Sequence, residues 1–208
     1  MPRAAVSGKG ECADGGSMLA PLLASTAFAA PDLELMAYRE ATRVPWAVRA
    51  GPLHPGVEGA LRWPLTRTEV VRVDVTARAG AFHHRALTTA GTADVGLAVR
   101  RSWPRGPMIG TELALGGLLG RAPGREYVPD GQGGWAHDAA RWRPAARVSL
   151  AVEAGFRVSR ADPAGPGLFL RVRHWAEAPF SPGFIPAMVH RDVGVALQLP
   201  LGGRGGAS

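Results

Sequence analysis

Six histidines are the residues of this 208-residue chain that most readily act as bases or metal ligands. They are His54, His83, His84, His137, His174 and His190. Imidazole binds zinc, copper and nickel, so a cluster of these side chains could hold an ion. His83 and His84 are adjacent, however, and adjacent side chains on a strand point to opposite faces. The chain has no H-E-x-x-H motif and only one cysteine, Cys12, so no Cys-based zinc site exists. The sequence therefore predicts no metal site and no cofactor.

Nucleophilic catalysis needs a serine or cysteine near a base and an orienting acid. The best available combination is Ser181 with His174 or His190 and with Glu177. Ser181 also stands in a Pro/Gly-rich segment, where serine commonly caps a turn. The catalytic residues thus stay unknown, with His174, Glu177 and Ser181 as candidates, and the sequence favours a protein that is not an enzyme.

The charge balance does not point to nucleic acid. The formal net charge is +7, but the basic residues form no run and lie beside acids along the chain. A nucleic-acid-binding surface needs basic residues gathered on one face or stripe. We therefore expect no nucleic-acid partner.

The first thirty residues have the features of an export signal. Residues 18–30 form an apolar stretch that ends in the A-x-A pattern Ala27-Phe28-Ala29. Such a stretch is typical of a secretory signal and too short to span a bilayer as a helix. We expect residues 1–30 to be a signal peptide or N-terminal extension, 31–201 one β-barrel domain, and 202–208 a flexible tail.

From residue 31 onward the hydrophobic period is two, which indicates β-strands. In the segment 70–81 the odd positions from Val71 to Ala81 are apolar, whereas Arg72, Asp74 and Arg78 occupy the opposite face. The same alternation predicts eight strands, at about 33–42, 56–64, 69–83, 87–102, 107–121, 145–159, 166–178 and 188–201. Several are longer than strands of soluble sheets usually are, and long enough to cross a bilayer when tilted.

The alternation fits two architectures of opposite sense. In a soluble barrel the apolar face points inward, whereas in a membrane barrel it points outward and polar or small side chains fill the lumen. The polar faces here are rich in small residues and mix charges of both signs, which favours a narrow lumen filled by ion pairs. The predicted lumen residues are Arg72, Asp74, Asp94, Arg100, Glu112, Arg147, Glu153, Arg171, Arg173 and Asp192.

The connections and the aromatic residues agree with the membrane sense. Alternate links are short, and the longest, 122–144, falls on the side where outer-membrane barrels have long loops. Aromatic rings favour the membrane interface, and most are expected near strand ends: Trp46, Trp63, Phe82, Trp103, Tyr127, Trp135, Trp142, Trp175, Phe180 and Phe184.

Over about residues 33–201 the chain resembles the small, eight-stranded outer-membrane β-barrels of Gram-negative bacteria. The resemblance rests on the strand pattern and on the closing segment 189–201, which ends in Leu201 where such proteins usually have an aromatic residue. It implies an up-and-down antiparallel transmembrane barrel that is exported to the outer membrane and surrounded by its lipid.

We therefore expect a structural or interaction protein with a filled lumen, not a porin. Its outer loops would face a protein partner through Tyr127, Trp135, His137, Phe180 and Phe184. Two alternatives stay open: a barrel-type lipid-modifying enzyme similar to an acyl hydrolase, and a soluble lipocalin-like barrel that binds an apolar ligand.

Overall fold

The structure is a computed structural model. It describes residues 30–43, 54–68, 70–85, 88–103, 106–121, 126–138, 142–158, 165–180 and 186–201. The expected signal segment 1–30 (except for Ala30) and the expected tail 202–208 lie outside the described residues. No helix in the described ranges is long and apolar enough to cross a membrane.

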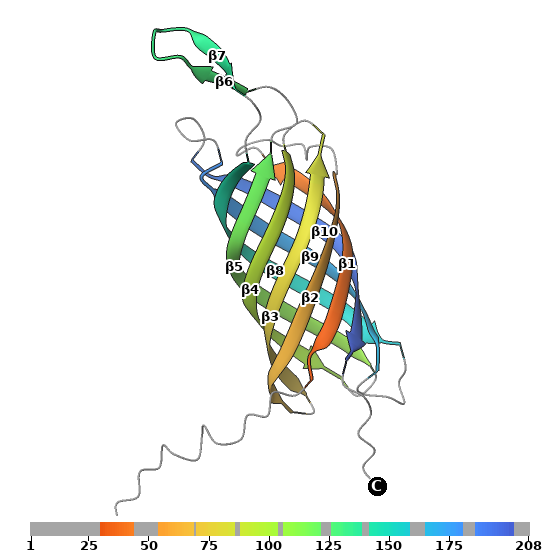
Figure 1. Cartoon of the computed structure of the whole chain (residues 1–208). Coiled ribbons are helices and arrows are strands. Elements are labelled where there is room, and N and C mark those ends of the chain that lie inside the picture. The colour runs from red at the N-terminus through yellow and green to blue at the C-terminus, as the bar shows by residue number, and fades with distance from the viewer. Residues whose placement is uncertain are drawn as a thin grey trace, which may run out of the picture.

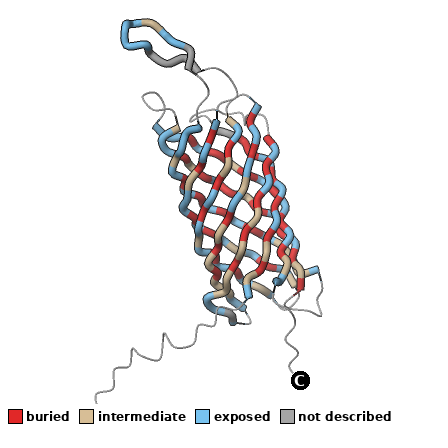
Figure 2. Tube along the Cα trace, in the orientation of Figure 1, coloured by how far each residue is buried: buried red, intermediate tan, exposed pale blue. Residues whose placement is uncertain are grey.

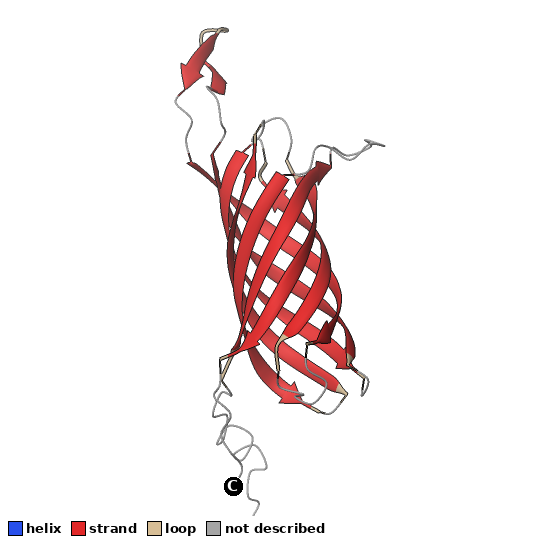
Figure 3. Ribbon diagram, turned by 90° about the vertical axis from the view of Figure 1, so that its right-hand side faces the viewer, coloured by secondary structure: helices blue, strands red, loops and turns tan. Residues whose placement is uncertain are grey.

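Eight long antiparallel strands close into one barrel (Figures 1 and 3). They are β1 (Asp32–Arg43), β2 (His54–Arg67), β3 (Val71–His84), β4 (Thr88–Ser102), β5 (Pro107–Arg121), β8 (Trp142–Arg157), β9 (Gly167–Ala178) and β10 (Met188–Pro200). The order around the barrel is β1-β10-β9-β8-β5-β4-β3-β2, and β1 closes it by pairing with β10 from Asp32↔Pro200 to Arg43↔Val189. The fold class and the eight predicted strands are confirmed.

The two ends of the barrel differ. The turn end carries the connections 68–70, 103–106 and 158–166, and there β1 begins at Asp32 and β10 ends at Pro200 (Figure 1). The loop end carries 44–53, 85–87, 122–141 and 179–187, and a two-stranded hairpin of β6 (Glu126–Pro129) and β7 (Trp135–Asp138) projects from it. The alternation pattern predicted neither β6 nor β7, and β8 begins three residues earlier than predicted.

Strand β2 is longer than predicted because a bulge carries it past Pro64. The register with β3 shifts between Pro64 and Thr66, and Leu65 is the extra residue. Proline cannot donate to the ladder, so a bulge is one of the few places where a strand accommodates it.

Burial alternates along every barrel strand, as the banding in Figure 2 shows. Leu113, Leu115 and Val95 are 55%, 60% and 64% exposed on the outer face, whereas Asp94 and Glu153 are buried inside. The apolar face thus points outward and the charged face inward. The alternative of a soluble lipocalin-like barrel is wrong, because such a barrel needs the opposite sense.

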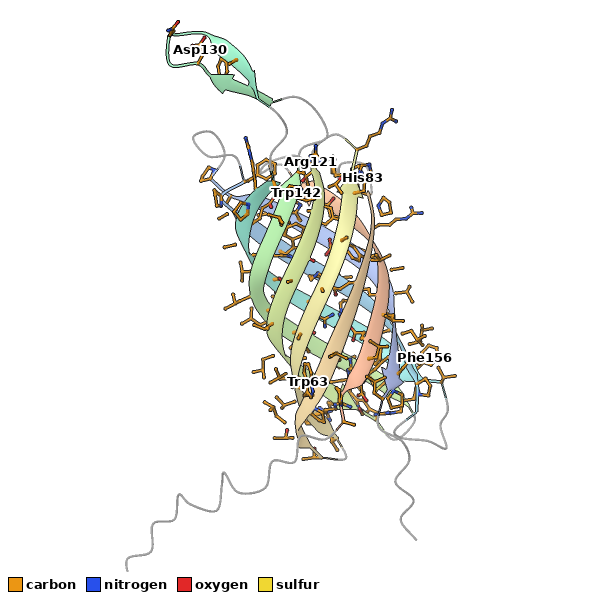
Figure 4. The ribbon with its side chains drawn as sticks, in the orientation of Figure 1. Trp63, His83, Arg121, Asp130, Trp142 and Phe156 are labelled. Atoms are coloured by element: carbon orange, nitrogen blue, oxygen red, sulfur yellow. The ribbon has the colours of Figure 1, made fainter. Side chains whose placement is uncertain are left out.

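The aromatic residues divide into two groups. Trp63 and Phe156 lie at the turn end and Trp142 lies at the loop end, as Figure 4 shows. Phe82 and Trp175, which were expected among the interfacial aromatics, are instead buried in the lumen, with 4% and 2% exposure. They share the parity of the inward charges on β3 and β9, so strand alternation sends them inside.

Candidate functional site: the filled lumen and its loop end

The middle of the lumen holds a network of buried ion pairs that we call the central ionic layer. Its members are Glu34, Glu58, Arg62, Arg78, Glu112, Glu153, Arg171 and Arg173. They come from six of the eight barrel strands. A charge removed from water must be paired and hydrogen-bonded, and each member of this layer meets an opposite charge.

Arg62 is the hub of the central ionic layer. Its side chain has no exposed surface, and its Nη1 lies 2.6 Å from Glu34 Oε2 and 3.4 Å from Glu153 Oε1. Its Nη2 lies 3.2 Å from Glu112 Oε2. In the ring of eight strands β2 is opposite β8, so the contact between Arg62 and Glu153 spans the lumen.

Arg171 and Arg78 reinforce the same carboxylates. Arg171 Nη1 lies 2.6 Å from Glu34 Oε1, and the Nη2 of the same guanidinium contacts Glu153. Arg78 Nη1 lies 2.9 Å from both Glu34 Oε1 and Glu58 Oε1, and Arg78 also contacts Glu112. Shared carboxylates therefore join the arginines into one network.

A second group of pairs lies between the central ionic layer and the loop end. Arg147 Nη1 is 2.6 Å from Asp94 Oδ2, and Arg173 Nη2 is 2.7 Å from Asp192 Oδ2. Trp175 donates its indole N–H to Asp192 Oδ1 at 3.0 Å. The polar groups at this level of the lumen thus bond to one another.

Glycine makes the Arg147–Asp94 pair possible. Gly116 stands between them in the register, opposite Asp94 on β4 and Arg147 on β8. A Cβ at Gly116 would lie 2.1 Å from the Ala93 carbonyl oxygen and 2.3 Å from Asp94 Oδ1. Gly110 occupies the equivalent place between Arg100 and Glu153. The inward glycines therefore leave room for long side chains to reach across a strand.

The turn end of the lumen is closed by a smaller group. Arg72 Nη1 lies 2.7 Å from Asp32 Oδ2, and Arg72 also contacts Asp74. Arg100 Nη2 lies 2.5 Å from Glu153 Oε1, and its guanidinium lies 4.1 Å from the centroid of the Phe169 ring. All ten predicted lumen residues therefore lie inside the barrel, in contact with opposite charges.

At the loop end, histidines face the carboxylates instead of arginines. We call Glu40, His54, His84, Glu177 and His190 the loop-end cluster; all five are buried. His190 Nδ1 lies 2.8 Å from Glu40 Oε1, and His190 Nε2 lies 3.1 Å from Glu177 Oε1. The His190 ring stacks on Trp175, with centroids 3.7 Å apart and planes 6° apart.

Three members of the loop-end cluster converge on one point. Glu40, His54 and His84 each offer a ligand atom, and these atoms lie within 4.8 Å of one another. The rings of His54 and His84 are 3.5 Å apart between centroids. Among the described residues, no other group of three His, Cys, Asp or Glu side chains is close enough together to hold a metal ion.

The structure separates one of the two predicted histidine–glutamate pairs and forms the other. His174 lies on the outer face of β9, whereas Glu177 lies on the inner face and contacts His190. Positions three residues apart on a strand have opposite parity, so these two side chains diverge. Ser181 lies outside the described residues. The pairing of His174 with Glu177 is therefore wrong, whereas the pairing of His190 with Glu177 forms, with His190 Nε2 3.1 Å from Glu177 Oε1.

Several lumen residues were absent from the predicted set: Glu34, Glu40, Glu58, Arg62, Arg78, Glu177 and His190. Each of these residues lies at an inward position of its strand, and the alternation of polar and apolar residues along the strand indicates that position. The convergence of His54 and His84 had a signal too. Antiparallel pairing of β2 with β3 matches Gly56 with Phe82, so two positions further along the ladder His54 meets His84.

The predicted partner-facing loop contains an ordered hairpin. Asp130 accepts hydrogen bonds at Oδ1 from the backbone N–H groups of Gln132 and Gly134, both at 2.8 Å. Gly131 and Gly133 have φ values of +78° and +88°, which favour glycine at this tip. Trp135 is 69% exposed on the hairpin.

The other predicted loop residues are described less fully. Tyr127 pairs with His137 through the backbone of the hairpin, and their side chains lie outside the described set. Phe180 is half-buried beyond the end of β9, and its N–H donates to the Pro186 carbonyl at 3.4 Å. Phe184 lies outside the described residues.

Solved structures with a similar fold are outer-membrane proteins. Neisserial surface protein A superposes with a TM-score of 0.53 at 7% identity, covering 82% of this chain and 96% of that one. The outer membrane enzyme PagL gives a TM-score of 0.44 at 13% identity, covering 81% and 99%. The attachment invasion locus protein Ail of Yersinia pestis gives a TM-score of 0.43 at 8% identity, and the match covers 82% of this chain and 99% of that one. Neither the protein-family models nor the curated proteins match this chain. The similarity is one of fold: that of small eight-stranded outer-membrane barrels.

Proposed function

We propose that this protein is an outer-membrane barrel with a lumen closed to solutes, which presents its loop end to a partner at the cell surface. The observation that carries the proposal is the inverted wall, apolar outside and charged inside. An apolar outer face of this size is stable when lipid covers it.

Closure of the lumen is supported by contacts that cross it. Arg62 on β2 reaches Glu153 on the opposite strand β8, and Arg173 on β9 reaches Glu58 on β2, with Nη1 2.6 Å from Oε2. Eight-stranded barrels have an interior only wide enough for side chains. A structural or interaction role therefore fits this lumen better than transport.

The interaction role is supported by the hairpin of β6 and β7. Its tip is held by the bonds of Asp130, and it projects beyond the barrel wall with Trp135 exposed (Figure 4). Exposed tryptophan in a preorganised loop is a common anchor of protein interfaces.

Membrane fractionation combined with a heat-modifiability gel tests the location. We expect the full-length protein in the outer-membrane fraction, migrating faster unboiled than boiled because the barrel stays folded in detergent. Recovery in the soluble periplasmic fraction would refute the proposal.

Closure is tested by planar-bilayer recording of the purified barrel. We expect no stepwise conductance under conditions in which a general porin conducts. Steady ion-conducting channels would show that the lumen is open, and would contradict the closed-lumen part of the proposal.

The partner-facing role is tested by a photo-crosslinking phenylalanine analogue at Trp135 in intact cells. We expect a discrete crosslinked product from this position and none from Phe156, an exposed aromatic at the turn end. Equal products from both positions, or none from either, would refute a contact through the hairpin.

A further inference from the structure

We propose that Glu40, His54 and His84 bind one divalent first-row metal ion, with zinc as the expected ion. The three side chains come from the adjacent strands β1, β2 and β3, at one level near the loop end. Glu40 stands opposite His54 in the register of β1 and β2. Positions 40, 54 and 84 are far apart along the chain, and the pairing of β1, β2 and β3 brings them together.

The donor set selects the class of ion. Two imidazole nitrogens and one carboxylate oxygen suit zinc and its first-row neighbours, whereas calcium and magnesium prefer all-oxygen sites. Three protein ligands also match the sites that keep a fourth position for water. Because the ligand atoms already lie within 4.8 Å of one another, small side-chain rotations bring them to bonding distance of one ion.

An unsatisfied histidine supplies independent support. His54 is 8% exposed, and its Nε2 is buried without a hydrogen-bond partner. A buried polar atom without a partner is costly, and such atoms in native structures call for an explanation. A bound ion would give this imidazole the partner that it lacks.

The surroundings of Glu40 have the form of an outer coordination sphere. His190 holds Glu40 Oε1 through Nδ1 and is itself held by Glu177 Oε1 through Nε2. Trp175 stacks on His190 and fixes the plane of its ring. Groups that orient a ligating carboxylate in this way raise metal affinity in known sites.

The charge of the lumen favours a cation at this end. The buried side chains include ten carboxylates but six arginines, and Arg72 at the turn end adds a seventh guanidinium. A divalent ion among the histidines would offset most of the remaining negative charge without a further arginine.

The test is zinc binding by the purified full-length barrel in detergent micelles, measured by calorimetry and by metal analysis after dialysis. We expect one zinc per chain. His54→Ala and His84→Ala should each weaken zinc binding by roughly 10- to 100-fold or more, because each removes a direct ligand. Glu40→Gln should weaken it in the same direction while keeping the side-chain volume.

His83→Ala and His174→Ala are the matched controls. Both histidines lie on the outer face, and His83 is the immediate neighbour of His84. We expect these variants to bind zinc like the parent protein. The heat-modifiability gel checks that every variant is folded. If His54→Ala fails to fold, His54→Gln keeps hydrogen-bonding capacity and replaces it.

Two results would overturn the proposal. One is the absence of stoichiometric zinc in the folded parent protein. The other is an equal loss of affinity in the inner and outer histidine variants, which would assign binding to scattered surface histidines. Because the measurement is made in micelles, its outcome does not depend on the cellular location or on the partner proposed above.

Discussion

The central ionic layer and the loop-end cluster occupy the same lumen behind the same apolar wall, yet their charges are balanced differently. In the central ionic layer, arginines that are permanently charged meet carboxylates, and Arg62 alone contacts Glu34, Glu112 and Glu153. In the loop-end cluster, Glu40 and Glu177 meet His190, whose charge depends on protonation. The central ionic layer is a network of paired opposite charges, whereas the loop-end cluster offers imidazole nitrogens that can coordinate an additional ion.

The difference teaches where function can reside in a filled barrel. Arg62 Nε has no hydrogen-bond partner, but carboxylates surround the guanidinium of Arg62, so the central ionic layer is expected to stabilise the barrel. The loop-end cluster is buried near the ends of its strands, and His54 Nε2 has no hydrogen-bond partner there. Four substitutions test this division, from the largest expected effect to the smallest.

Replacing the hub of the central layer should have the largest effect. Arg62→Met leaves three carboxylates buried without this partner, so we expect a loss of about 3–5 kcal/mol in the free energy of unfolding. Urea unfolding of the barrel in lipid vesicles measures it. Arg121→Met, at an exposed arginine on β5, is the control and should change stability by about 0.5 kcal/mol or less. Similar values for both variants would contradict a structural central layer.

A charge on the outer wall tests the premise that both regions share, namely that lipid surrounds them. Leu113→Arg, near the middle of β5, should cost about 2–4 kcal/mol in vesicles, and Leu119→Arg, near the loop end, about 0–1 kcal/mol. The same urea titration provides both values. A cost independent of depth would argue against a membrane wall.

A substitution at Gly116, which lies between Asp94 and Arg147, tests packing without changing any charge. Gly116→Ala places a Cβ 2.1 Å from a backbone oxygen, so we expect a loss of about 1–3 kcal/mol as the strands and the ion pair adjust. Gly117→Ala is the matched neighbour, because the nearest atom to its Cβ would be 3.7 Å away. Equal unfolding curves for the two variants would show that the tight register is not required.

The smallest effect is expected at the loop end. Glutamine is shorter than histidine, so His190→Gln weakens the hydrogen-bonded link between Glu40 and Glu177. We expect a loss of about 1–2 kcal/mol in the free energy of unfolding. His174→Gln makes the same exchange on the outer face and should be near neutral. A loss for His190→Gln as large as that for Arg62→Met would erase the distinction between the two regions.

Strand alternation alone predicted much of this molecule. It placed Val95 and Leu115 outside and Asp94 and Glu153 inside, and its mixture of charges indicated the inverted sense. The expectation of interfacial aromatics misplaced Phe82 and Trp175, whose parity on β3 and β9 directs them into the lumen. It also missed the hairpin of β6 and β7, whose four-residue strands are too short to show a period.

The sequence by itself determined which side chains face inward, because alternation is a local property of an extended chain. Only the tertiary structure decided which of them meet. Barrel closure and register bring Arg62 to Glu153 across the lumen and His54 to His84 across adjacent strands. Those meetings join positions far apart in the chain, and a shift of one residue in any ladder would turn a strand's charges to the other face. Strand registry around the closed ring, which no local pattern encodes, therefore set both the ionic network and the cluster at its rim.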